Sequence, residues 1–177
     1  MTNLIKMKIE VIFLVFALIF GSMFAVINPP FISLDEGAHF VKAFDVSQGH
    51  IIPSNGPTID IPKSIFSIPG IRGLNNNLVY SISDSKKFDY IPYLKIPFNI
   101  KDTIEIGQRN TNVYMPLPYL ATALVIKIGE FFNISPLVLL YFGRLINLLF
   151  YIVVVYFAIK IVPIGKYIFL LLALMPM

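Results

Sequence analysis

Apolar runs separated by a polar, proline-rich middle section dominate this sequence. Residues 11–27 form the first run, 116–132 and 137–162 form two more, and 167–177 form a short fourth one. A helix needs about 20 predominantly apolar residues to cross a bilayer. The pattern therefore predicts transmembrane helices over residues 9–28 and 137–162, and a third, truncated one over 167–177. The first run is longer than the apolar part of a signal peptide, which favours a retained helix.

The section after the first run has a different pattern. Turn-forming residues recur every few positions in IIPSNGPTIDIPKSIFSIPGIRGLNNN, which predicts an irregular loop with short strands at most. Ahead of it, Leu34, Ala38, Val41 and Phe44 recur near helical spacing. We therefore expect a helix over residues 34–48 that lies with one apolar face along the membrane surface.

Local signals mark both ends of that helix. Ser33 and Glu36 have the spacing of a capping box, in which each side chain satisfies the other residue's backbone amide. Gly49 is placed as the C-terminal stop. The run over 116–132 begins with two prolines and carries two charges, so we expect a second surface helix there rather than a crossing.

Lysine positions decide between two topologies. If residues 116–132 lie flat at the outer interface, the helix over 137–162 runs inward. Lys160 and Lys166 then share the cytoplasmic side with Lys6 and Lys8, as the positive-inside tendency favours. The alternative, in which 116–132 crosses the membrane, places Lys160 and Lys166 outside.

Composition agrees with a membrane location. Charged residues make up 14% of the chain, whereas soluble domains carry about 25%. The fold class we expect is an all-α integral membrane protein whose long extracytoplasmic first loop, residues 29–136, carries the two interfacial helices. Cysteine is absent, which excludes disulfides and thiolate metal sites. No clustered basic face is visible, so nucleic acid is not an expected partner.

Two carboxylates and an imidazole stand where the chain leaves the first apolar run. In SLDEGAHF, His39 follows Asp35 by four residues and Glu36 by three, so its ring could reach either carboxylate on one helical turn. Acids at a helix start are also explained by the helix dipole alone. A carboxylate at head-group depth could instead accept a proton from a hydroxyl or hold a divalent cation against a phosphate.

Arg144 is a charge inside the long apolar run. At about 1.5 Å per residue it lies about 10 Å into the predicted helix. A charge near the bilayer centre costs about 3 kcal/mol by insertion scales, so it requires a partner or a task. One interpretation is a structural residue that binds a neighbouring carbonyl. The other is a partner for Asp35 or for a substrate phosphate.

Several motifs resemble one family of predicted bacterial membrane proteins, domain-of-unknown-function family 2142. They are NPPFISLDEGAHFVKAFDVSQGHI, YMPLPYLATALVIKIG and YFGRLINLLF, in this order. That family is similar in plan to the GT-C integral-membrane glycosyltransferases, which pass a sugar from a polyprenyl-phosphate donor to an acceptor outside the cytoplasm. The resemblance implies a multi-pass protein of the bacterial cytoplasmic membrane.

The resemblance also implies roles for individual residues. GT-C enzymes carry an acidic residue or pair in the first external loop, a place that Asp35 and Glu36 occupy, and an arginine early in a later helix, which Arg144 matches. Asp35 would be the general base or a cation ligand and Glu36 the second acid, with Arg144 and His39 binding substrate or phosphate. The partners implied are membrane lipid and a lipid-linked sugar donor, and the cofactor, if any, is a divalent cation.

The chain stops in the middle of an apolar run, which predicts that it is the N-terminal part of a longer protein and inactive by itself. A second acidic loop and further helices are expected to follow. The alternative function is a non-catalytic polytopic membrane protein: a transporter component, a structural subunit or an inactive remnant, in which the Asp35–Glu36 pair only caps a helix.

Overall fold

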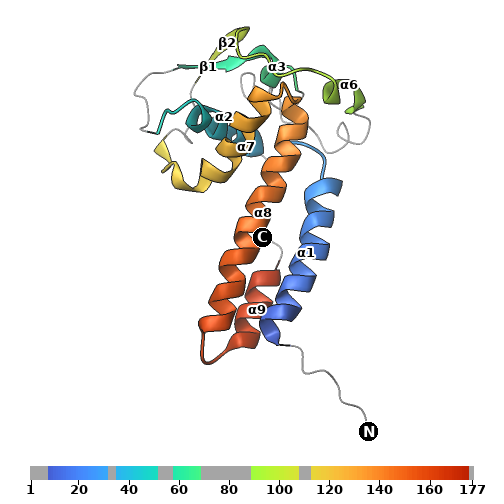
Figure 1. The fold of residues 1–177 in the computed structure, drawn as a ribbon, viewed down its shortest axis with the longest axis vertical. Helices are drawn as coiled ribbons and strands as arrows, with labels where there is room; N and C mark the ends of the chain where they lie inside the picture. Colours follow the sequence, from blue (N-terminus) through green and yellow to red (C-terminus); the bar gives the residue numbers. More distant parts are fainter. Residues whose placement is uncertain (1–7, 32–34, 52–57, 69–88, 108–112, 176–177) are drawn as a thin grey trace. The chain divides into compact units, whose positions relative to one another are not determined.

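The computed structural model describes residues 8–31, 35–51, 58–68, 89–107 and 113–175. Its elements, in chain order, are α1 (Ile9–Ile27), α2 (Glu36–Ser47), β1 (Thr58–Pro62), α3 (Lys63–Phe66), α6 (Ile91–Leu94), β2 (Thr103–Gly107), the 3₁₀ helix η2 (Leu117–Tyr119), α7 (Leu120–Phe131), α8 (Pro136–Ile161) and α9 (Lys166–Leu174) (Figure 1).

The chain divides into two compact units. We call residues Met1–Ile27 with Asn147–Met177 the terminal unit, and Asn28–Ile146 the central unit. Helix α8 contributes to both. Each unit has its own cluster of buried apolar side chains, and each is described by itself below.

The terminal unit contains α1, the second part of α8, and α9. Phe13 and Ala17 of α1 pack with Ile152 and Ile159 of α8 in its buried cluster, and the Tyr151 hydroxyl donates to the Ala173 carbonyl at 2.7 Å. Most other apolar side chains of these helices are exposed. A lipid environment suits such an exposed apolar surface.

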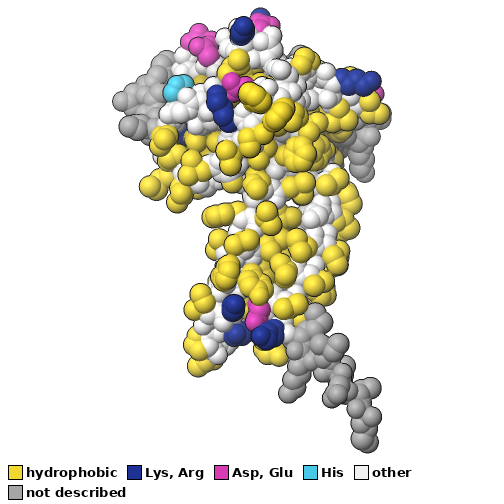
Figure 2. Space-filling view, in the orientation of Figure 1, with side chains coloured by type: hydrophobic (Ala, Val, Ile, Leu, Met, Phe, Trp, Pro, Cys, Tyr) yellow, Lys and Arg dark blue, Asp and Glu magenta, His cyan; other side chains and the backbone are white. Residues whose placement is uncertain are grey.

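Charged side chains of the terminal unit gather at one end (Figure 2). The described ones are Lys8, Glu10, Lys160 and Lys166, at the start of α1, the end of α8 and the start of α9. Two described helices, α1 and α8, are long and apolar enough to cross a membrane. The nine residues of α9 are fewer than a crossing needs.

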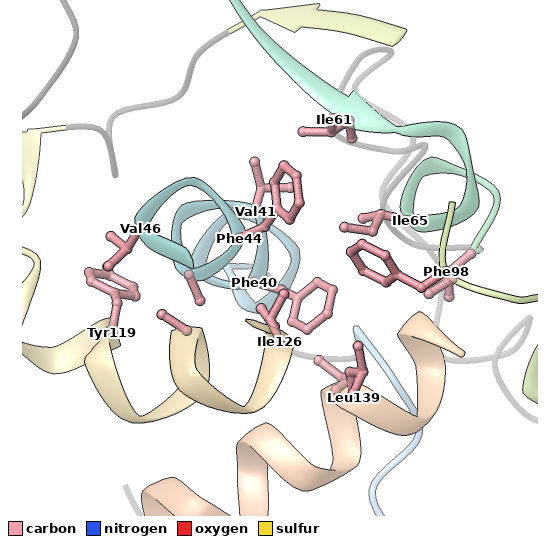
Figure 3. Packing of buried hydrophobic residues seen from close by; sticks show 14 of the residues in the cluster. Phe40, Val41, Phe44, Val46, Ile61, Ile65, Phe98, Tyr119, Ile126 and Leu139 are labelled. Atoms are coloured by element: carbon pink, nitrogen blue, oxygen red, sulfur yellow. The ribbon is translucent and has the colours of Figure 1, made fainter. Parts of the chain in front are cut away.

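Helix α2 is the central helix of the central unit, which corrects the expectation of a surface helix. Phe40, Val41 and Phe44 are buried in a cluster that also takes side chains from β1, α3, α7 and the start of α8 (Figure 3). The stretch expected to be an irregular loop therefore supplies part of a hydrophobic core. Helix α7 lies against α2 along its length (Figure 1).

A buried ion pair explains how α2 can lie in the core although it carries charged residues. Lys42 Nζ lies 3.1 Å from Asp45 Oδ2, and both side chains are almost fully buried. Asp45 Oδ1 also lies 2.7 Å from Nδ1 of His50, whose ring is exposed. Buried charges are tolerated when they are paired and hydrogen-bonded, so the two polar positions can enter the core together.

A two-stranded antiparallel sheet, β1 with β2, adds strand structure to the expected all-α fold. Ile59 pairs with Ile106 and Ile61 with Ile104. The strands TIDIP and TIEIG alternate polar and apolar residues, which is the period-two pattern of a half-buried strand. Strand β1 lies in the stretch where the sequence allowed short strands, and its partner β2 comes from a segment about 40 residues further along the chain.

Helix boundaries follow local chemistry. Gly49 has a φ of 91° just after α2, so the predicted glycine stop is confirmed. Asn133, with φ 53°, ends α7 in the same left-handed region. Helix α8 then starts at Pro136, where the missing amide hydrogen is harmless, and the Leu137 amide donates to Ser135 Oγ at 3.3 Å.

The start of α2 differs from the predicted capping box. The helix begins at Glu36, and Asp35 occupies the N-cap position without a hydrogen bond from its side chain. Ser33, the predicted cap, lies outside the described residues. The Glu36 carboxylate accepts a hydrogen bond from the Phe31 amide at 2.7 Å.

Candidate functional site

The site is built on the turn that joins the first apolar run to α2. Phe31 follows Pro29 and Pro30 and has a φ of 58°, a left-handed conformation that is an outlier for a bulky residue. Burial of its ring, edge-to-face with Phe40 at 6.5 Å, and the bond from its amide to Glu36 hold it there. The left-handed conformation of Phe31 is therefore held by tertiary contacts rather than by local preference.

Glu36 and Arg144 form the strongest polar contact of the site. Arg144 Nε donates to Glu36 Oε1 at 2.6 Å and Nη2 donates to Oε2 at 2.8 Å. Both side chains are largely buried, at 18% and 15% exposure. A bidentate pair of this kind is roughly twice as strong as a neutral hydrogen bond and fixes orientation. It ties the first turn of α2 to α8 across 108 residues of sequence.

Arg144 also holds the proline turn. Nη1 donates to the Asn28 carbonyl at 2.7 Å and Nη2 donates to the Pro29 carbonyl at 3.1 Å, while the guanidinium lies 5.2 Å from the centre of the Tyr141 ring. The partner that the sequence required for this charge is thus Glu36 together with backbone carbonyls, which is the structural interpretation. The guanidinium is largely occupied by protein, and its predicted role in binding phosphate stays a prediction.

Asp35 differs from its neighbour. It is exposed, it makes no capping bond, and among the described residues no ion pair or hydrogen bond of its carboxylate is present. The adjacent carboxylates are therefore divided: Glu36 is engaged in structure, and Asp35 faces solvent at the start of α2. This division could not be read from the sequence, in which the two acids are equivalent.

His39 meets tyrosines rather than a carboxylate. Its Nδ1 lies 2.8 Å from the hydroxyl of Tyr119, and its ring is nearly parallel to those of Tyr119 and Tyr114, at 25° and 20°. Burial, followed by the neighbouring Tyr114, raises the pKa of the Tyr119 hydroxyl. Tyr119 therefore stays a neutral phenol around pH 7 and keeps its hydrogen bond to the imidazole.

The sequence left a divalent cation open as a possible cofactor at Asp35. Such ions take about six or more oxygen ligands, and within the described part of the chain no group of three or more His, Cys, Asp or Glu side chains is arranged to hold a metal. Glu36 is committed to Arg144 and His39 to Tyr119. Asp35 is exposed and could serve as one ligand.

A comparison with protein-family models matches residues 18–177 to the family described as "Predicted membrane protein (DUF2142)". The chain belongs to this family. The match covers the second part of α1, from residue 18, together with the described parts of the central unit, α8 and α9, so the membrane character of DUF2142 applies to the candidate spans found here. Neither the comparison with curated proteins nor that with solved structures gave a match.

Tyr114 and Tyr119 are the residues of the DUF2142 site that sequence reasoning missed. They lie in YMPLPY, between the proline-rich section and α7, which the sequence analysis used only as part of a family motif. Their partner His39 is 80 residues away from Tyr119, which no periodicity reveals. A signal was nevertheless present, since two tyrosines and two prolines within six residues make a rigid aromatic turn.

Proposed function

We propose that this DUF2142 chain is the N-terminal part of a GT-C-like glycosyltransferase that takes a sugar from a polyprenyl-phosphate donor at the outer face of the bacterial cytoplasmic membrane. The observation that carries the proposal is the difference between the two adjacent acids at the start of α2. Glu36 is fixed by Arg144, and the carboxylate of the adjacent Asp35, at the N-cap position of α2, is exposed.

The proposed reaction uses Asp35 as general base. The carboxylate accepts the proton of an acceptor hydroxyl as its oxygen bonds to the anomeric carbon of the sugar. The bond between that carbon and the phosphate oxygen breaks, and polyprenyl phosphate leaves with the electron pair. Glu36 and Arg144 act as positioning residues, because they fix the helix turn on which Asp35 stands. A well-placed base contributes about 10²- to 10⁴-fold to such a step.

The test replaces Asp35 by Asn in the whole protein of which this chain would be a part. Membranes are incubated with polyprenyl-phosphate-linked glucose, mannose and aminoarabinose, and release of polyprenyl phosphate is measured, a readout that does not require the acceptor to be isolated. We expect Asp35→Asn to lower release at least about 100-fold. Abundance and membrane insertion should be unchanged, since the carboxylate makes no capping bond.

The matched control is Asp102→Asn, an exposed aspartate of the same unit whose partner is the equally exposed Lys63. It should leave release unchanged. Full release by Asp35→Asn would refute the role of Asp35. If the parent protein releases no polyprenyl phosphate from any of the three donors, the non-catalytic reading, a transporter component or structural subunit, replaces the transferase.

A further inference from the structure

Two tyrosine rings lie beside the His39 ring in the central unit. His39 comes from α2, while Tyr114 and Tyr119 come from the segment that leads into α7. The His39 ring centre lies 6.2 Å from that of Tyr114 and 5.8 Å from that of Tyr119. Parallel rings in full overlap lie about 3.5 to 4 Å apart. These rings are therefore strongly offset, so that each leaves part of its face uncovered by its neighbour.

The cluster is anchored at one side and open at the other. Tyr119 is buried, and its hydroxyl is hydrogen-bonded to His39 Nδ1. This bond fixes the orientation of the imidazole, which stays exposed to solvent. Tyr114 is 49% exposed, and His39 is exposed as well. An aromatic surface held in one orientation but open to solvent loses little conformational freedom when a ligand settles on it.

Polar groups stand at the edge of this surface. Asp35 and His39 are four residues apart, and the His39 amide donates to the Asp35 carbonyl at 2.9 Å, so their side chains follow one face of the helix about 5 to 6 Å apart at Cβ. His39 Nε2 has no hydrogen-bond partner among the described residues. An exposed carboxylate acceptor and an imidazole nitrogen thus border the aromatic faces.

We propose that Tyr114 and His39 form a docking platform for the pyranose ring of a sugar, with Asp35 at its edge. A pyranose has a flat face of C–H bonds, which are attracted to the negative face of an aromatic ring, and a rim of hydroxyls that suits a carboxylate and an imidazole. This inference rests on the proposed function, because it names the surface that presents the sugar to Asp35.

The test measures sugar binding separately from sugar transfer. The chain is solubilised in a detergent without a sugar head group, and saturation-transfer NMR is recorded with the methyl pyranosides of glucose, galactose and mannose. Ribitol, an open-chain polyol with no ring face, is the comparison probe. We expect at least one pyranoside to receive saturation at its ring C–H protons, and ribitol to receive none.

Variants then assign the binding to the platform. Tyr114→Ala should weaken pyranoside binding about five- to tenfold, the effect of losing one aromatic contact, whereas Tyr114→Phe, which keeps the ring, should bind within about twofold of the parent. Tyr167→Ala, which removes an exposed tyrosine of α9, is the matched control and should bind like the parent. Circular dichroism and size-exclusion profiles verify that each variant is folded.

The outcomes separate the two proposals. Equal binding by Tyr114→Ala and the parent, equal saturation of ribitol, or no pyranoside binding by the folded parent would overturn the platform. Tyr114-dependent binding supports it. If binding depends on Tyr114 but the whole protein releases no polyprenyl phosphate, the transferase reaction falls while the sugar platform stands. Loss of release in Asp35→Asn without any Tyr114-dependent binding leaves the reaction and removes the platform.

Discussion

The polar residues of the site have two different roles: some stabilise the fold, and one is exposed to solvent. Arg144 donates to the Glu36 carboxylate and to the Asn28 and Pro29 carbonyls, so one guanidinium fixes both the start of α2 and the turn before it. Asp35, next to Glu36, is left exposed. Neutralising Asp35 should therefore spare the structure, whereas neutralising Glu36 should not, because Glu36 has a structural partner.

Breaking the Glu36–Arg144 pair should destabilise the protein. Glu36→Gln leaves a largely buried guanidinium without its counter-charge, and we expect a loss of about 2–3 kcal/mol. Thermal unfolding in detergent, followed by circular dichroism, measures it. Arg144→Met combined with Glu36→Gln should be less destabilising than the sum of the single changes, because both remove one interaction.

An exposed ion pair of the same unit is the control for that measurement. Lys63 and Asp102 lie 2.6 Å apart with both side chains more than half exposed, so Lys63→Gln should change stability by less than about 1 kcal/mol. Should Glu36→Gln unfold at the same temperature as Lys63→Gln, the pair does not hold the turn, and the structural role assigned to Arg144 is wrong.

Helix α7 has two apolar faces, of which one is buried in the core and the other is exposed. Ala123 and Ile126 are buried in the core against α2, and Gly129 packs so closely on Leu139 of α8 that a Cβ would lie 2.1 Å from its side chain. The other face is also apolar but exposed, and its residues are Leu120, Leu124, Ile128 and Phe131. The exposed charge on this helix, Lys127, is paired with Glu130 at 3.0 Å.

If residues 116–132 form a surface helix, as the sequence predicts, the exposed face of α7 should lie in the outer leaflet of the bilayer. The chain contains no tryptophan, so a single Trp reports depth without background. In liposomes that contain brominated phospholipid, fluorescence of Leu124→Trp should be quenched strongly, because Leu124 is exposed and apolar. Lys101→Trp, in the turn before β2, should be quenched little. Equal, weak quenching at both positions would show that α7 stays in water.

For the whole molecule, the lysines of the terminal unit make one topology the simplest. Lys8, Lys160 and Lys166 lie at the same end of its helices, so one placement of this end in the cytoplasm satisfies all three. By chain connection the central unit then begins outside, after α1. This agrees with the flat arrangement of residues 116–132 and gives Asp35 access to an extracytoplasmic substrate, as the proposed function requires.

Cysteine labelling tests this topology, because the chain has no cysteine of its own. Ile164 is 84% exposed in the connection before α9, and its replacement by Cys avoids the left-handed Gly165. In intact cells an impermeant maleimide should label Lys101→Cys and leave Ile164→Cys unlabelled, and lysis should make both reactive. Labelling of both in intact cells would mean that residues 116–132 cross the membrane.

The sequence alone determined the features that depend on neighbouring residues. Apolar length predicted the spans that α1 and α8 occupy, the glycine after residue 48 predicted the end of α2, and the cost of a buried charge predicted that Arg144 has a partner. Each follows from composition or spacing within a few turns of helix. The DUF2142 motifs placed the chain in its family by the same local means.

Only the tertiary structure decided which side chains of the site contact each other, because the sequence allowed more than one pairing. Glu36 rather than Asp35 meets Arg144, and His39 meets Tyr119 rather than a carboxylate, through contacts between residues 108 and 80 positions apart. Helix α2 entered the core because Lys42 and Asp45 neutralise each other there. Such choices depend on how the chain folds back on itself, and the energy of a distant contact leaves no periodic trace in the sequence.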